Sequence, residues 1–137
     1  MIRHRAWLGG ALVALVAVLG GCRESESAFC SDLRRVDTAL GALRDAKARD
    51  DFGSVPELVD DVADAYEGIE PPPVLQGDWA TAIEFFRHQG EDARSLLTQG
   101  QLPETPAEQE ARYSQAFTNI TDYGVAHCGR ARGQLVP

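Results

Sequence analysis

Apolar residues after position 28 recur at alternating intervals of four and three. The first run consists of Phe29, Leu33, Val36, Leu40 and Leu43. This spacing places one apolar stripe along a helix and is typical of a helix in a bundle. We therefore expect a first amphipathic helix that begins near Phe29 and ends before Gly53.

A second and a third segment show the same period. Their stripes are Val55, Leu58, Val59, Val62, Tyr66 and Ile69, and then Leu75, Trp79, Ile83, Phe86, Leu96 and Leu97. The capping-box spacing of Ser54 and Glu57 marks the start of the second segment. Three consecutive prolines after Glu70 require its end there. The third segment contains Gly90 as a weak point, and Gly100 is expected to stop it.

A fourth segment completes the helical pattern. Its stripe consists of Tyr113, Phe117, Ile120 and Gly124. Thr105 and Glu108 form a second capping box, with Pro106 at the expected first helical position. The chain shows no strand-like alternation of any length. We therefore predict an all-α fold, in which residues 28–130 form an up-down-up-down four-helix bundle and residues 131–137 a C-terminal tail.

The first 21 residues have the composition of an export signal. Arg3 and Arg5 make a basic start, and an acid-free apolar run of 14 residues follows from Ala6 to Leu19. This run is too short to cross a hydrocarbon core, which needs about 20 residues. We therefore expect residues 1–21 to be a cleaved signal peptide that stands apart from the bundle.

The end of this segment resembles a processing motif. Leu19-Gly20-Gly21-Cys22 is similar to the lipobox of bacterial lipoproteins. The resemblance implies cleavage before Cys22 and diacylglyceryl modification of its sulfur, with acyl chains such as palmitate. Two acyl chains give a stable anchor, whereas one binds only marginally. Residues 22–27 would then be the lipidated N-terminus and a polar tether, on the extracytoplasmic face of the cell membrane. The alternative is an ordinary secretory signal that leaves Cys22 as a spare thiol.

The cysteine count makes sense once lipidation is assumed. Three cysteines are an odd number for an exported protein. If Cys22 is lipidated, Cys30 and Cys128 remain as one pair in an oxidising compartment. The predicted bundle places both at one pole, because they fall in the first turn of the first helix and the last turn of the fourth. We therefore expect one disulfide that closes nearly the whole domain.

The charge balance is strongly acidic. The chain has 21 acidic and 13 basic residues, and loss of residues 1–21 would change the formal net charge from −8 to −10. Nucleic-acid affinity depends on Lys and Arg displacing counterions, and anionic lipid headgroups also attract basic residues. We therefore expect no nucleic-acid partner, and membrane contact only through the lipid anchor at Cys22.

Candidate metal and catalytic residues are few. His88, His127, Cys30 and Cys128 are of types that bind zinc, but adjacent His-Cys lacks the usual ligand spacing. No C-x-x-C motif is present, no activated free thiol is indicated, and no serine lies in a G-x-S-x-G context. We therefore expect no metal, no cofactor and no enzyme activity, with His127 at a helix C-terminus that favours its charged form.

Two side-chain clusters remain as candidates. The acidic cluster comprises Asp60, Asp61, Asp64 and Glu67. These four share one helix face, which we interpret as solvated, or alternatively as a contact for a weak cation or a basic partner. Phe85 and Phe86 point about 100° apart, so both cannot lie at the centre of one narrow seam. We interpret these aromatic residues as core packing, or alternatively expect one of the two to lie toward the surface or to line a cavity between helices.

The whole pattern loosely resembles small helical lipoproteins of high-GC Gram-positive bacteria, with Phe-Cys opening the first helix and His-Cys-Gly closing the last. This resemblance implies no known activity. We expect a non-catalytic, membrane-anchored interaction or accessory module with an envelope protein as partner. The alternative is a binder of a small apolar or amphipathic ligand inside the bundle, which rests on the aromatic third and fourth segments.

Overall fold

The computed structural model describes the backbone of residues 21–130 and side chains from residue 25 onward. The helices are α1 (Gly21–Ala48), α2 (Val55–Glu67), α3 (Gln76–Gln99) and α4 (Ala107–Cys128), with short 3-10 turns at Phe52–Ser54 and Pro73–Leu75. No strand occurs within this range, so the all-α prediction is confirmed. The signal peptide expected before Cys22 lies outside the described residues except for Gly21, and so does the tail at 131–137.

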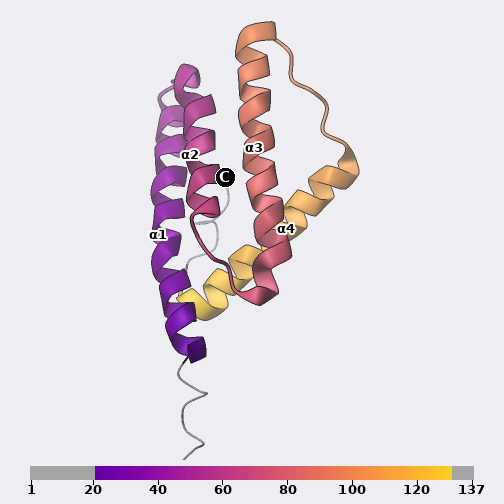
Figure 1. Cartoon of the computed structure of the whole chain (residues 1–137). Coiled ribbons are helices and arrows are strands. Elements are labelled where there is room, and N and C mark those ends of the chain that lie inside the picture. Colours follow the sequence, from indigo (N-terminus) through magenta and orange to yellow (C-terminus); the bar gives the residue numbers. More distant parts are fainter. Residues whose placement is uncertain (1–20, 131–137) are drawn as a thin grey trace, which may run out of the picture.

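Three helices lie side by side, and the fourth crosses them. α2 packs against both α1 and α3, and the chain reverses direction from each helix to the next (Figure 1). α4 packs mainly against α3 and runs obliquely back to the first turns of α1. A regular up-down-up-down bundle stays a prediction, because α4 does not follow α1 along its length.

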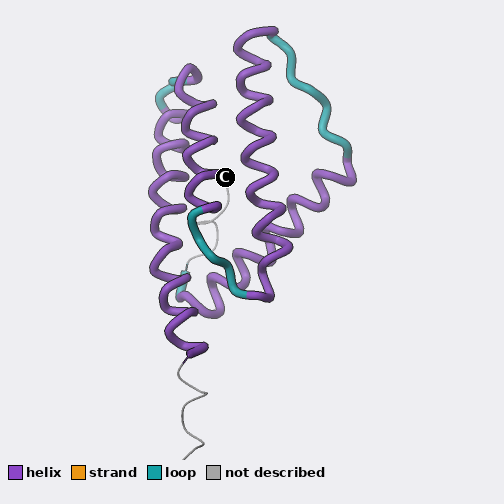
Figure 2. Tube along the Cα trace, viewed as in Figure 1, coloured by secondary structure: helices purple, strands orange, loops and turns teal. Residues whose placement is uncertain are grey.

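The predicted stripes of α1, α2 and α4 supply most of the core. Its buried side chains include Phe29, Leu33, Val36, Leu40, Leu43, Val59, Val62, Tyr66, Ile69, Leu75, Trp79, Phe86, Tyr113, Phe117 and Ile120. Leu96 and Leu97 were expected in the same core, and this prediction is wrong, because they are 44% and 53% exposed. Figure 2 shows the reason: the loop after α3 runs outward from the other helices, so that α4 contacts α3 near the start of α3 and leaves the end of α3 uncovered.

The predicted capping boxes are not formed. The Ser54 hydroxyl donates to Asp51 at 2.9 Å and makes no cap to α2, because the 3-10 turn leads directly into the helix. Pro106 takes the N-cap position of α4 and also makes no side-chain cap. The stop at Gly100 is confirmed: this residue has a left-handed φ of 68°, and its N–H donates to the carbonyl oxygen of Leu96.

Two helix boundaries differ from the expected positions. α1 is already helical at Gly21, so residues 22–27, expected as a tether, lie in its first turns. α2 ends at Glu67, three residues before Glu70. The backbone N–H of Gly68 bonds to the carbonyl oxygen of Asp64 and closes this last turn.

Candidate functional site

A disulfide joins α1 to α4 at the pole where α1 starts. Cys30 and Cys128 are bonded, with their Cα atoms 5.3 Å apart, so the predicted pairing is confirmed. Arg130, just beyond α4, forms an ion pair with Asp37 of α1 and donates to the backbone oxygen of Cys30. The end of α4 is therefore held against α1 by one covalent and two polar contacts.

His127 lies at the same pole and connects the same two helices. Its Nδ1 atom is 2.9 Å from Oε1 of Glu26, and its ring stacks on Tyr123 with 4.1 Å between centroids. His88 lies elsewhere, on α3, about 4.0 Å from a carboxylate oxygen of Asp92. Among the side chains described from residue 25 to residue 130, no three from His, Cys, Asp or Glu come together as ligands for a metal ion.

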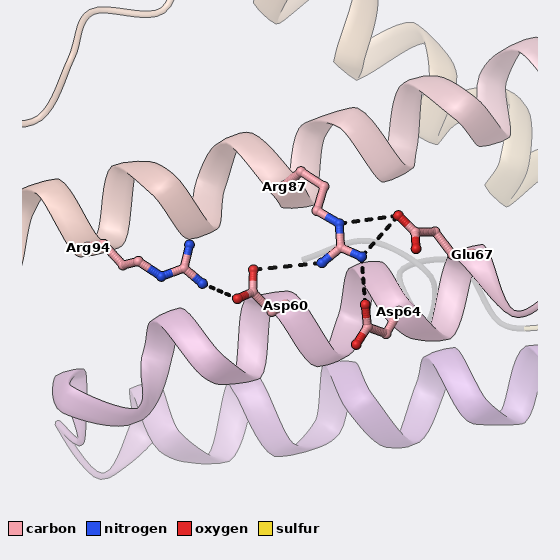
Figure 3. A network of polar contacts seen from close by, with 5 residues as sticks. All are labelled: Asp60, Asp64, Glu67, Arg87 and Arg94. Atoms are coloured by element: carbon pink, nitrogen blue, oxygen red, sulfur yellow. Dashed lines mark hydrogen bonds and ion pairs between the residues drawn. The ribbon is translucent and has the colours of Figure 1, made fainter.

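Three members of the acidic cluster of α2, Asp60, Asp64 and Glu67, face two arginines of α3 (Figure 3). Arg87 contacts Asp64 at 2.6 Å and Glu67 at 3.0 Å, and Arg94 pairs with Asp60. The hydrogen bonds to Asp64 and Glu67 raise the pKa of Arg87. Three of the four acids therefore pair with arginines of α3. Asp61, Asp64 and Glu67 remain exposed, so this face is solvated and also carries these ion pairs.

Gly90 lies on α3 between these two arginines. A Cβ atom at this position would lie 2.7 Å from Oδ1 of Asp60, closer than a side chain tolerates. The helix continues through Gly90 without a break. The glycine expected as a weak point therefore allows the close approach by which Asp60 reaches Arg94.

The two adjacent phenylalanines of α3 separate as expected. Phe86 is buried, and Phe85 is half-buried. The Phe85 ring makes edge-to-face contacts with Phe86, Tyr113 and Phe117, each with 5.1 Å between centroids. These contacts fill the interface between α3 and α4 with aromatic rings.

A groove of about 740 Å³ lies at the disulfide pole, a size typical of small-molecule sites. Its walls are the first turns of α1, the loop after α2 and Tyr123 of α4. The carboxylates that line it are Glu26, Asp32 and Glu70. We refer to it as the acidic groove. Sequence analysis missed it because its walls come from three separate segments, and the prolines of the loop were interpreted only as a helix stop.

Three exposed leucines lie at and just after the end of α3. Leu102, in the loop after α3, is 62% exposed, and it follows the exposed Leu96 and Leu97 within seven residues. We refer to these three residues as the leucine patch. The end of α3 lies far from the start of α1 (Figure 1), so the leucine patch and the acidic groove are at opposite ends of the molecule.

Cys22 falls in the first turn of α1, and its side chain is outside the described part. Across residues 21–130, no helix combines the length and apolar character needed to cross a membrane. Comparisons with protein-family models, with curated proteins and with solved structures find no match for this chain.

Proposed function

We propose that this protein is a lipid-anchored, non-catalytic interaction module on the extracytoplasmic face of the cell membrane. The likeness of residues 19–22 to a lipobox supports the anchor, with Cys22 as the lipidated N-terminus after removal of residues 1–21. α1 has 28 residues, about 42 Å at 1.5 Å per residue. We also propose an up-down-up-down path for the four helices. In this path α1 extends from the lipidated N-terminus and holds the pole where α3 ends away from the bilayer.

The observation that carries the proposal is the leucine patch. Single exposed leucines are ordinary on protein surfaces. Here, three large apolar side chains are exposed within seven residues at one helix end, Leu96, Leu97 and Leu102. Grouped apolar exposure of this kind marks protein contacts. Its position at the pole opposite the expected anchor leaves it open to a partner in the envelope.

The charges around the leucine patch favour a basic partner. The segment from 91 to 110 contains five acids and one base. That base, Arg94, already pairs with Asp60. Complementary charge steers encounter and selects partners, so we propose an envelope protein that presents an apolar segment flanked by Lys or Arg. The acidic cluster of α2 is less suited to this role, because Arg87 and Arg94 occupy it.

Crosslinked affinity capture from envelope fractions tests this proposal. The wild-type protein is compared with a secreted Cys22→Ala form, with Leu96→Ser/Leu97→Ser, and with the control Val74→Ser, whose side chain is 73% exposed outside the patch. We expect wild type and control to capture the same basic envelope protein, the double variant at least 10-fold less, and the secreted form none. Equal capture by the wild type and the double variant would contradict a role for the patch. Membrane retention of a Cys22→Ala form that lacks residues 1–21 would contradict the anchor.

The alternative function, binding of a small apolar or amphipathic ligand inside the bundle, has weaker support. The rings of Phe85, Phe86, Tyr113 and Phe117 contact one another between α3 and α4. The groove at the disulfide pole is instead bordered by carboxylates, which disfavour a purely apolar ligand.

A further inference from the structure

We infer that the acidic groove is a binding site for a linear aliphatic polyamine, a ligand whose ammonium groups are separated by short methylene chains. This site is distinct from the leucine patch and does not depend on the proposed interaction with an envelope protein. The inference rests on the charge of the groove, on the spacing of its carboxylates and on its apolar walls.

The charge of the groove is one-sided. Glu26, Asp32 and Glu70 line it, and among the side chains described from residue 25 to residue 130 no Lys, Arg or His does. Two of these carboxylates have a cationic neighbour outside the lining: His127 contacts Glu26 at 2.9 Å, and Arg35 is 3.9 Å from Asp32. Glu70 forms no ion pair with any Lys, Arg or His side chain described between residues 25 and 130. A concave surface lined by one sign of charge concentrates the opposite sign, so the groove favours a cation.

The placement of the carboxylates favours a ligand with several separated charges. Asp32 lies about two turns after Glu26 on α1, and Glu70 belongs to the facing loop. A bound divalent ion needs several oxygen ligands at about 2.0–2.6 Å, and no such group of side chains converges in the described part of the chain. Ammonium groups along a flexible chain can each approach one carboxylate without bringing the three together.

The remaining walls suit the methylene segments of a polyamine. Phe29 and Tyr123 meet edge to face with 5.8 Å between ring centroids, and both line the groove. Pro71-Pro72-Pro73 and the exposed Val74 form the facing wall. Methylenes bury apolar area against these side chains, and an ammonium group near the Tyr123 ring gains cation–π attraction.

Isothermal titration of the secreted Cys22→Ala form with spermidine tests this inference. We expect saturable 1:1 binding that Asp32→Asn/Glu70→Gln weakens at least 10-fold. The charge-matched control is Glu104→Gln/Glu108→Gln, which removes two exposed acids away from the groove and is expected to change Kd less than 2-fold.

Three outcomes would overturn the inference. Equal weakening of spermidine binding in both double variants would show that spermidine is attracted diffusely to an acidic protein. Absence of saturation up to millimolar spermidine would show that no such site exists. Mg²⁺ binding as tight as spermidine binding, with the same loss in Asp32→Asn/Glu70→Gln, would assign the groove to a metal ion. Neither of the first two outcomes affects the capture experiment, because that experiment depends on the leucine patch.

Discussion

The indole N–H of Trp79 donates a hydrogen bond to the backbone carbonyl oxygen of Tyr66, with 2.9 Å between the two atoms. The two ring centroids are 4.6 Å apart, and both side chains are buried. Tyr66 lies in the last turn of α2 and Trp79 in the first turn of α3. This pair therefore fixes the two helices at the point where the proline loop connects them.

Replacement of Trp79 by Phe should lower the free energy of unfolding by about 1–3 kcal/mol, because it removes both a buried donor and part of a buried ring. Urea denaturation measures the change. The control is Phe52→Ala, at an aromatic residue that is 58% exposed, with an expected change of less than about 0.5 kcal/mol. A Trp79→Phe variant as stable as the wild type would contradict a structural role for this hydrogen bond.

Stability should fall at alkaline pH because of Tyr66. Burial raises the pKa of this phenol above its ordinary value. Above about pH 10 the unfolded chain releases the proton while the folded protein keeps it, so the free energy of unfolding falls by up to about 1.4 kcal/mol per pH unit. At pH values below the ordinary tyrosine pKa, the contribution of Tyr66 to the free energy of unfolding does not change with pH.

Urea denaturation between pH 8.5 and pH 11 measures this slope. Tyr66→Phe should make it clearly shallower. A smaller slope should persist in that variant, since burial also raises the pKa of Tyr123. An identical slope in the wild type and in Tyr66→Phe would contradict the assignment to Tyr66.

Loss of the disulfide should destabilise the protein strongly. Cys30 and Cys128 are 98 positions apart, and a loop of this length is worth about 4.7 kcal/mol in the chain-entropy model, with typical measured values of about 2–4 kcal/mol. The Cys30→Ala/Cys128→Ala protein should therefore unfold at markedly lower urea concentration. Reduction of the wild type should produce the same shift, and it should leave the double variant unchanged. A shift below about 1 kcal/mol in both would contradict this prediction.

Replacement of Gly90 by alanine should change stability less favourably than the same replacement at another helical glycine. Alanine is favoured over glycine inside a helix by about 1 kcal/mol. Gly41 of α1 has no neighbour within 4 Å of an added Cβ, so Gly41→Ala should gain this amount. Gly90→Ala should gain less or lose stability, because its Cβ displaces Asp60 from Arg94.

A double-variant comparison isolates the cause. In an Asp60→Ala background, Gly90→Ala should be stabilising by about 1 kcal/mol, as at Gly41. An equal effect of Gly90→Ala with and without Asp60 would show that the carboxylate does not restrict this position.

Local sequence patterns predicted the helices and most of the core. The spacing of Phe29, Leu33, Val36, Leu40 and Leu43 specifies one helix face, and that face is buried. The same reasoning failed at Leu96 and Leu97, because a period indicates which side chains share a face and does not show whether another helix covers them. The oblique path of α4 is a tertiary property that no local pattern contains.

The polar contacts were harder to predict because their members are far apart in the sequence. Arg87 and Arg94 are seven positions apart and therefore share a face of α3, which is the one sequence signal for their pairing with α2. The spacing at Ser54 predicted where α2 begins, but the capping box is not formed, because the preceding 3-10 turn places the Ser54 hydroxyl against Asp51. The acidic groove depends on three segments whose proximity only the fold establishes.

Site-specific photo-crosslinking tests the central claim most directly. A photo-reactive residue is placed at Leu97 in the leucine patch, or at Val74 as a control, in the membrane-anchored protein and in the secreted Cys22→Ala form. Our account predicts a discrete adduct with a basic envelope protein from position 97 of the anchored protein, and none from position 74 or from the secreted form. Adducts of equal yield from both positions, or no adduct at position 97, would contradict it.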